Sequence, residues 1–397
     1  MKVLISNLGS TSLKYRLFDF SDSGEEVLTK GGFERVVNHA DAIEETLQQL
    51  RDGGFIESEN DLAAVGFKTI MARETSGCVE LTEDVLEAMA FYNEIAPAHN
   101  PPYIAGVRQF REKMPSVPMV GLFETSFYQW TAPAAQRYAV PHEWYELGIR
   151  RWGFHGASHK FIAERSAELL GREDVAERCR RLYVDGGKTA IDGPDLRVVS
   201  CHMGGSSSVT GIRNGVAIGT SMGLSPQSGL PQNNRVGDLD SFALPFVMRK
   251  TGIGLDEAER LMTKEAGLAG ISGVSNDLRD IQDAADQGNE RAKLAIDYLT
   301  HQTRHWIGAF HFDLNGLDAL VFTAGIGENR GPLRTDVCAN LENLGIKIDP
   351  EANEALRGKE GVVSADDSAV KVMVIPTNEE LVVAREVKRF LEARASA

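Results

Sequence analysis

The chain has 397 residues, of which 42% are hydrophobic and 25% are charged, as in ordinary soluble globular proteins. This length exceeds what one hydrophobic core usually organises, so we expect two domains. A formal net charge of -15 argues against nucleic acid and against an anionic membrane surface as partners. No apolar run is long enough for a membrane span, and the cysteines lack metal-ligand spacing, so we expect a cytoplasmic protein with reduced thiols.

Two segments far apart in the chain share one layout: an apolar run, a turn of glycine and hydroxyl residues, and a second strand-like run. The first covers residues 3–18 and the second covers residues 198–218. Glycine lets a backbone approach an anion closely, and the neighbouring N–H and O–H groups supply donors. Each turn alone could be an ordinary hairpin. Their similarity favours duplicated domains that hold one polyphosphate between them.

Hydrophobic periodicity and turn residues predict alternating helices and strands, which is typical of an α/β fold. Between the two turns, helices are predicted over 42–53, 82–95 and 103–113, and strands over 62–70 and 117–123. A crossover at 130–150 leads to the second domain, where the strands restart at residue 196. Further elements are helices over 239–251, 255–266, 277–314 and 379–393, and strands over 317–323 and 370–375. Prolines near residue 100 predict a rigid loop carrying His99, and Asn378 is expected to cap the last helix.

Two loops carry the strongest candidates for chemistry. His155 lies in Gly153–His159, between glycines and ahead of a helix, where a packed core histidine is not expected. We interpret it as a donor to developing negative charge. For His159, structural and functional roles are equally open. Arg235 lies in a polar loop beside glycine and aspartate, so it is either an anion ligand or an ordinary surface arginine.

Three further features have both a structural and a functional interpretation. Lys14 is either a surface charge or a neutraliser of a phosphoryl group. Glu379 suits the N-terminus of a helix through the helix dipole, and it could also be a Mg²⁺ ligand. Gly325–Asn329 follows a buried strand, as nucleotide-binding turns do, although a lone GxG is weak evidence. The chain has neither GxxxxGK[ST] nor a strand-initial GxGxxG, which argues against a P-loop enzyme and a standard dinucleotide fold.

Taken in order, these segments resemble the acetate kinase family of the actin, sugar kinase and Hsp70 (ASKHA) superfamily. The most specific motifs lie at 7–14, 96–101, 153–159, 235–238, 322–329 and 375–380. The resemblance implies two duplicated, ribonuclease H-like domains around a central cleft. Residues 1–128, completed by the C-terminal helix 380–397, would form one domain, and residues 129–379 would form the other with the nucleotide site.

The resemblance also implies an activity and a set of site residues. The reaction would be reversible transfer of the ATP γ-phosphoryl group to a short carboxylate, acetate by default, in a homodimer that uses Mg²⁺ or Mn²⁺. Catalysis would fall to Asn7, Lys68, Glu124, His155 and Arg235. The acid would lie against Lys68, Ala98, His99, Phe154 and Pro226. ATP would contact Ser10, Ser12, Lys14, His202, Gly204, Gly205, Asp277, Arg279, Gly325, Ile326 and Asn329. The metal would be held by Asn7 and Glu379.

Four positions depart from the family pattern. Lys68 replaces an arginine and loses its bidentate fork, for which Arg73 is a candidate substitute. Gly205 replaces a phosphate-contacting asparagine, with the hydroxyls of residues 206–208 nearby. Glu124 replaces an aspartate, and Ala98 replaces a leucine of the acyl pocket. These changes leave open a larger or functionalised acid such as propionate or butyrate, a different phosphoryl donor such as pyrophosphate, and a weakly active nucleotide-binding paralogue.

Overall fold

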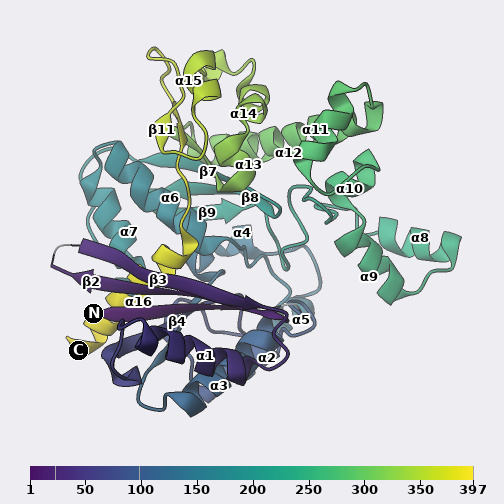
Figure 1. The fold of residues 1–397 in the computed structure, drawn as a ribbon. Coiled ribbons are helices and arrows are strands. Elements are labelled where there is room, and N and C mark those ends of the chain that lie inside the picture. Colours follow the sequence, from purple (N-terminus) through teal and green to yellow (C-terminus); the bar gives the residue numbers. More distant parts are fainter. Residues whose placement is uncertain (23, 98, 397) are drawn as a thin grey trace.

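The computed structural model describes residues 1–22, 24–97 and 99–396, which form two six-stranded sheets (Figure 1). The first sheet has the order β3-β2-β1-β4-β6-β5, and the second has the order β11-β12-β10-β7-β8-β9. The strands of the first sheet are β1 Lys2–Leu8, β2 Ser12–Ser21, β3 Gly24–Glu34, β4 Leu62–Thr69, β5 Cys78–Glu80 and β6 Met119–Phe123. Those of the second are β7 Arg197–Met203, β8 Ser207–Arg213, β9 Val216–Thr220, β10 Ala319–Thr323, β11 Gly361–Val362 and β12 Lys371–Val374.

The two sheets have the same topology. In each, three consecutive strands form an antiparallel meander, the first of these strands pairs in parallel with the fourth, and a further parallel strand follows. A short antiparallel strand, β5 or β11, closes the outer edge of each. This repetition confirms the predicted fold of two duplicated α/β units, with the two glycine- and serine-rich turns at equivalent hairpins.

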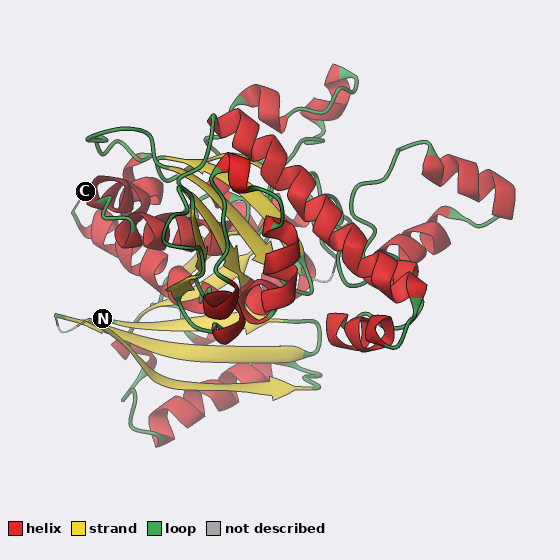
Figure 2. Cartoon of the chain, turned by 90° about the horizontal axis from the view of Figure 1, so that it is seen from above, coloured by secondary structure: helices red, strands yellow, loops and turns green. Residues whose placement is uncertain are grey.

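Sixteen α-helices are assigned in the described part of the chain, and several of them cover the faces of the two sheets. Their bounds are α1 His39–Asp52, α2 Glu83–Ala90, α3 Asn100–Lys113, α4 Pro133–Gln136, α5 His142–Glu146, α6 Gly156–Leu169, α7 Glu173–Asp185, α8 Ala243–Thr251, α9 Leu255–Lys264, α10 Gly267–Ser272, α11 Leu278–Asp286, α12 Glu290–Leu314, α13 Ala324–Asn329, α14 Gly331–Cys338, α15 Pro350–Ala355 and α16 Glu379–Ala395. Figure 2 shows α12 lying along the second sheet and the α8–α9 pair extending away from the body.

The C-terminal helix α16 lies between the two sheets (Figure 1). Val382, Val383 and Val387 pack on Val3 and Ile5 of the first sheet, opposite the face that α1 and α3 cover. On its other side, α16 contacts α6 and α7, which cover the second sheet. The buried ammonium of Lys160 on α6 pairs there with Glu386 of α16. A charged contact buried in this way loses much stability if one partner is removed, so it fixes how the two halves meet.

The expected elements are present, and several boundaries were wrong. The predicted helix 277–314 is two helices, because the chain turns at Gly288, where φ is 89°, and Asn289 caps α12. The predicted helix 82–95 ends at Ala90, although Thr82 caps it as its sequence suggests. The expected loop at residues 100–102 is the first turn of α3, where proline is tolerated because the first N–H groups have no helical partner. Asn378 caps α16 as predicted.

Candidate active site

Several of the predicted site residues lie where parallel strands of the two sheets end. Asn7 and Lys68 are near the carboxyl ends of β1 and β4, and Glu124 follows β6. In the second sheet, His202 is near the end of β7 and Gly325 follows β10. Parallel strands bring their carboxyl ends to one edge, where α/β proteins bind ligands. The duplicated topology therefore supplies two such edges.

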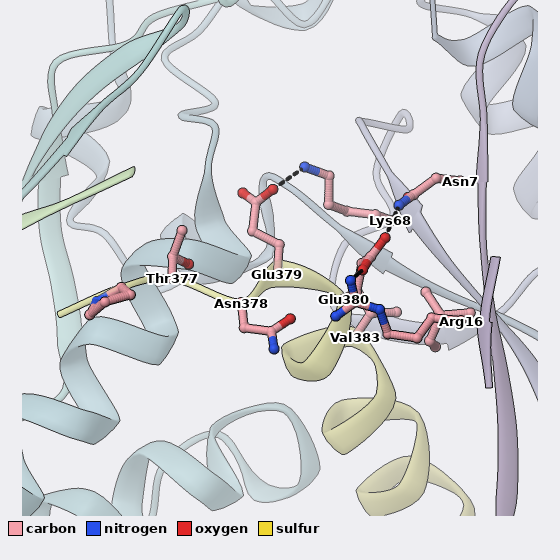
Figure 3. Close-up of a pocket in the computed structure, with 10 residues that line it drawn as sticks. Asn7, Arg16, Lys68, Thr377, Asn378, Glu379, Glu380 and Val383 are labelled. Atoms are coloured by element: carbon pink, nitrogen blue, oxygen red, sulfur yellow. Dashed lines mark hydrogen bonds and ion pairs between the residues drawn. The ribbon is translucent and has the colours of Figure 1, made fainter. Parts of the chain in front are cut away.

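Two cavities at these edges share one residue, Lys68. The larger, of about 650 Å³, is lined by Asn7, Lys68 and the first turn of α16 (Figure 3). The smaller, of about 350 Å³, is lined by residues of both sheets' edges, including Lys68, His155 and Arg235. Lys68 therefore separates a space beside α16 from a space between the two halves of the molecule.

Lys68 pairs with two carboxylates at once. Its Nζ lies 2.7 Å from Oε2 of Glu379 and 3.0 Å from Oε1 of Glu124 (Figure 3 shows the first contact). Burial disfavours the ammonium, but both carboxylates outweigh it and raise the pKa of Lys68 above its usual value. Burial and the nearby Glu379 raise the pKa of Glu124, whereas for Glu379 the ammonium of Lys68 outweighs burial and lowers the pKa. Two unlike carboxyl groups thus share one cation.

Asn7 is held by residues that the sequence did not single out. Its Nδ2 donates to Oε1 of Glu380 at 3.0 Å, and its Oδ1 accepts from the Tyr103 hydroxyl at 3.3 Å. The other oxygen of Glu380 lies 2.8 Å from the Arg16 guanidinium (Figure 3). The sequence offered only weak signs that Arg16 and Glu380 belong to the site. Arg16 is two positions after Lys14 on the same face of β2, and Glu380 directly follows Glu379.

The backbone of the Gly153–His159 segment is built to bring His155 to Glu124. The Gly156 N–H donates to the Glu124 carbonyl at 3.0 Å, and a β-carbon at Gly156 would lie 2.2 Å from that oxygen. Only glycine permits so close an approach. His155 itself has φ of 57°, a left-handed conformation uncommon for a non-glycine residue, at the N-cap of α6. Strain of this kind is typical of functional sites.

Three histidines and three serines form a hydrogen-bonded cluster behind the cavity. The Ser208 hydroxyl lies 2.8 Å from Nδ1 of His155 and 2.8 Å from Nε2 of His159. His159 Nδ1 is 2.8 Å from Ser200 Oγ, so the contacts run in series from Ser200 to His155. If each donor points toward His155, its Nδ1 accepts from Ser208 and its Nε2 carries the proton.

The third histidine, His202, stacks on His155 with ring centroids 4.0 Å apart and bonds to Ser158 at 2.9 Å. Burial is the main reason that the pKa values of all three histidines fall, to about 4 for His202 and well below 6.5 for His155 and His159. Each neighbouring imidazole adds to this effect in His155. The cluster is therefore neutral at pH 7, and His155 can act as an uncharged donor.

Arg235 approaches the same cavity from the loop before α8. Its Nη1 donates to Gln232 at 3.1 Å and to the Ser206 hydroxyl at 3.4 Å. The Gly229 N–H donates to the Asp238 carboxylate at 2.9 Å, and the backbone N–H of Asp238 donates back to Gly229, which closes the loop at its base. No carboxylate pairs with Arg235 among the described residues, so its charge is available to an anion.

The remainder of the smaller cavity is largely apolar. Beside Lys68, Glu124 and Arg235, it is lined by Ile70, Ile95, Ala96, Pro97, His99, Tyr103, Phe154, His155, Ser206, Pro226, Gln227, Thr263 and Lys264. Of the predicted acid-binding residues, Lys68, His99, Phe154 and Pro226 are thus together, and Ala98 lies outside the described residues. Loss of solvation in the cleft, then the charges of Arg235 and Lys68, lower the pKa of His99.

The sequence pattern of the acetokinase family matches residues 33–385. The chain belongs to this family. An acetate kinase of Alkaliphilus metalliredigens is 40% identical over 418 aligned residues, which cover 98% of this chain and all of that protein (100%). The crystal structure of Porphyromonas gingivalis acetate kinase has a TM-score of 0.86 at 34% identity, covering 98% of this chain and 99% of that one. A propionate kinase from Francisella tularensis has a TM-score of 0.83 at 29% identity, covering 97% and 98%.

Membership in the acetokinase family confirms the predicted resemblance and the enzyme class, a carboxylate phosphotransferase. Several of the residues that are expected to bind the nucleotide lie on two neighbouring segments of the second sheet's edge. His202 and Thr323 are register partners on β7 and β10, so the turn at Gly204 and the helix α13 lie side by side. Asn329 bonds back to the Gly325 carbonyl at 2.9 Å within α13.

None of the predicted ATP residues, all of which lie in the described part of the chain, lines either of these two cavities. Asp277 caps α11 by accepting from the Arg279 N–H at 2.8 Å, and the Arg279 side chain, 81% exposed, pairs with it. Lys14 is 62% exposed and pairs with Glu34 at 3.1 Å. Ser10, Ser12 and Lys14 line neither cavity. Arg73 also lines neither; it pairs with Glu74 at 3.5 Å and lies over the ring of Phe91.

The acetokinase site offers oxygen ligands for a divalent cation. Oε1 of Glu379 and Oε2 of Glu124 are buried without a hydrogen-bond partner among the described residues. No group of three or more histidine, cysteine, aspartate or glutamate residues there forms a protein-only metal cage. Mg²⁺ suits this donor set, because it is commonly held by one or two carboxylates together with substrate phosphates and water. No helix in the described segments combines the length and apolarity needed to cross a membrane.

Proposed function

We propose that the chain transfers the γ-phosphoryl group of ATP reversibly to a short carboxylate, with acetate as the first candidate and an acyl phosphate as the product. One observation carries the proposal: Lys68, His155 and Arg235 converge on a cavity of about 350 Å³ that both halves of the molecule line. Phosphoryl transfer requires two substrates in line and neutralisation of oxygen charge more than covalent chemistry. A site made of a lysine, an arginine and a neutral histidine suits that requirement.

Each residue has a distinct task under this proposal. The acid's alkyl group lies against the apolar walls at Phe154 and Pro226, and its carboxylate faces Lys68. Arg235 binds equatorial oxygens of the phosphoryl group, and the Nε2–H of His155 donates to them as charge develops. Since His155 is neutral, it donates without adding a proton to the product. The second sheet's edge, at Gly204 and Gly325, would hold the nucleotide.

A divalent cation, Mg²⁺ by preference, completes the proposal. Glu379, Glu124 and the Oδ1 of Asn7 would hold it, directly or through water. When bound, the ion neutralises phosphate charge and orients the transferred group. The contact between Lys68 and Glu379 keeps that carboxylate ionised, as a metal ligand must be.

The apolar lining also supports a larger acid as a second candidate. Ile70, Ile95 and Phe154 offer a wall for an alkyl chain. The experiment is acyl-phosphate formation, trapped with hydroxylamine, over straight-chain acids from formate to valerate with ATP or pyrophosphate. The highest kcat/KM with acetate and ATP supports the first candidate, and a maximum at propionate or butyrate supports the second. Absence of turnover with every pair, despite ATP binding, would overturn the proposal.

Two variants test the site itself. Arg235→Ala and His155→Ala should each lower kcat by at least ~100-fold, the scale expected when a transition-state donor is removed. Near-normal rates in both would contradict the assignment.

We also propose that the protein is a homodimer. The α8–α9 pair extends from the body, and α8 has no buried residue. Phe242 is 77% exposed and Phe246 is 56% exposed, which is unusual for side chains that remain in water. Sedimentation velocity should give a dimer for the natural chain and a monomer for Phe242→Glu/Phe246→Glu. A natural chain that sediments as a monomer would contradict the proposal.

A further inference from the structure

The second glycine-rich turn has glycine at position 205, where the family resemblance implies a phosphate-contacting asparagine. Gly205 stands at that position, exposed between β7 and β8. The nearby hydroxyls that could have replaced the amide are already engaged. Ser207 bonds the backbone of Gly204, and Ser208 bonds two histidines. Ser206 accepts from Arg235.

The side chain of Asn233 occupies the space beside Gly205. A β-carbon placed on Gly205 would lie 3.5 Å from Nδ2 of Asn233 and 3.9 Å from its Cγ, with no other heavy atom within 4 Å outside the adjacent residues. Asn233 comes from the loop that carries Arg235, about 28 residues farther along the chain, so its proximity could not be read from the sequence. An amide is thus present at the turn, but it arises from another loop.

The backbone of Asn233 is fixed from two sides. Its N–H donates to the Gly205 carbonyl at 3.3 Å, which ties the loop to the turn. Its carbonyl accepts from the N–H of Ala269 at 2.9 Å, in the short helix α10. With both backbone groups held, the amide has a defined position at the edge of the turn.

The amide itself has no partner in the described protein. Oδ1 of Asn233 is buried without a hydrogen bond, and Nδ2 donates to no described residue. The donor Nδ2 has no competing acceptor among these residues, so it is free to donate to an oxygen of a bound ligand.

We infer that Asn233 supplies the phosphate-contacting amide that Gly205 does not, by donating from Nδ2 to a phosphate oxygen of the bound nucleotide. The inference rests on the proposed function, since it takes ATP as the ligand. It makes Gly205 and Asn233 one functional pair: the glycine leaves room for an amide that reaches the turn from the neighbouring loop. Asn233 and Arg235 then act from the same loop on adjacent phosphate groups.

The test is ATP binding by isothermal titration calorimetry, with acyl-phosphate formation as a second readout. Asn233→Ala should weaken ATP binding about 10- to 100-fold, the scale of a hydrogen bond to a charged group. Asn233→Asp should weaken it further, because a carboxylate then faces phosphate. Asn233→Ala/Gly205→Asn should recover most of the loss by returning the amide to the turn. Asn234→Ala, a neighbouring amide on the same loop, is the matched control and should bind ATP normally.

The contrary results separate the role of Asn233 from the proposed function. Unchanged ATP affinity in Asn233→Ala would refute the role of Asn233. Loss without recovery in the double variant, with Asp no worse than Ala, would show that Asn233 merely anchors the loop and would refute it as well. A natural chain that binds ATP through Asn233 but forms no acyl phosphate would refute the proposed function and leave this inference intact.

Discussion

The Nζ of Lys68 lies 2.7 Å from Oε2 of Glu379, and this contact joins the edge of the first sheet to the start of α16. Glu124 lies on the other side of the same ammonium at 3.0 Å. One cation therefore faces two carboxylates before any substrate carboxylate arrives. Under the proposed function, an incoming acid would share Lys68 with these two groups, so the charge balance at this point would set acid affinity.

Removal of the Lys68 charge should disable the site without unfolding the protein. In Lys68→Ala, Glu124 and Glu379 face each other without a cation, and the pKa of Glu124 should rise further. We expect kcat/KM for the acid to fall at least ~100-fold, with a larger share in KM than in kcat. Initial rates over a range of acid concentrations measure both.

Lys68→Arg keeps the charge but adds a broad, planar fork. A gain on acetate would show that lysine merely weakens the family's usual contact, whereas a loss would show that Lys68 fits a different acid. Arg73→Ala is the matched control, because Arg73 is an exposed arginine that pairs with Glu74. A loss in this control as large as that in Lys68→Ala would contradict the assignment to Lys68.

The series from Ser200 to His155 predicts a positioning role for His159. Loss of the His159 ring nitrogens leaves Ser208 free to donate elsewhere, so the tautomer of His155 is no longer enforced. His159→Phe should lower kcat about 10-fold with little change in acid KM. The ¹⁵N chemical shifts of His155, which report its tautomer, should change in parallel. An unaltered tautomer with reduced kcat would indicate a packing effect instead.

The buried histidines should make folding stability depend on pH. For His202 the native pKa is about 4, below its ordinary value of 6.5, so in between the unfolded chain binds a proton that the native protein excludes. Stability is complete above pH 6.5 and falls as the pH is lowered, by about 2 kcal/mol per such histidine between pH 7 and pH 5. Urea unfolding at both pH values measures this, and His202→Asn should reduce the difference. A stability that is equal at both values would contradict a neutral cluster.

The sequence was sufficient for features that depend on neighbours along the chain. The two hairpins, the caps at Thr82 and Asn378, and the αβ alternation all follow from local patterns. The break at Gly288 was missed because helical periodicity continues on both sides of it, and an isolated glycine is often tolerated in a helix. The division at residues 128 and 129 remains a prediction.

The candidate site was less accessible to sequence reasoning than the fold. Asn7, near the end of β1, and His155, at the N-cap of α6, have distinctive local motifs. Arg16 and Glu380 are ordinary charged residues that lie hundreds of positions apart in the chain but pair in the fold. Asn233 becomes a candidate only because its side chain lies beside Gly205. Such contacts depend on how the sheets meet, which no local pattern encodes.

Adjacent glutamates on α16 allow a direct test of the metal proposal. Glu379 has one oxygen on Lys68 and one buried oxygen without a partner, whereas both oxygens of Glu380 are engaged by Asn7 and Arg16. A Mg²⁺ ligand requires a free oxygen, so Glu379→Gln should raise the Mg²⁺ concentration for half-maximal rate at least ~10-fold. Glu380→Gln should lower the thermal midpoint and leave that concentration nearly unchanged. If both variants shift the Mg²⁺ requirement equally, or neither does, Glu379 serves only to begin the helix and pair with Lys68.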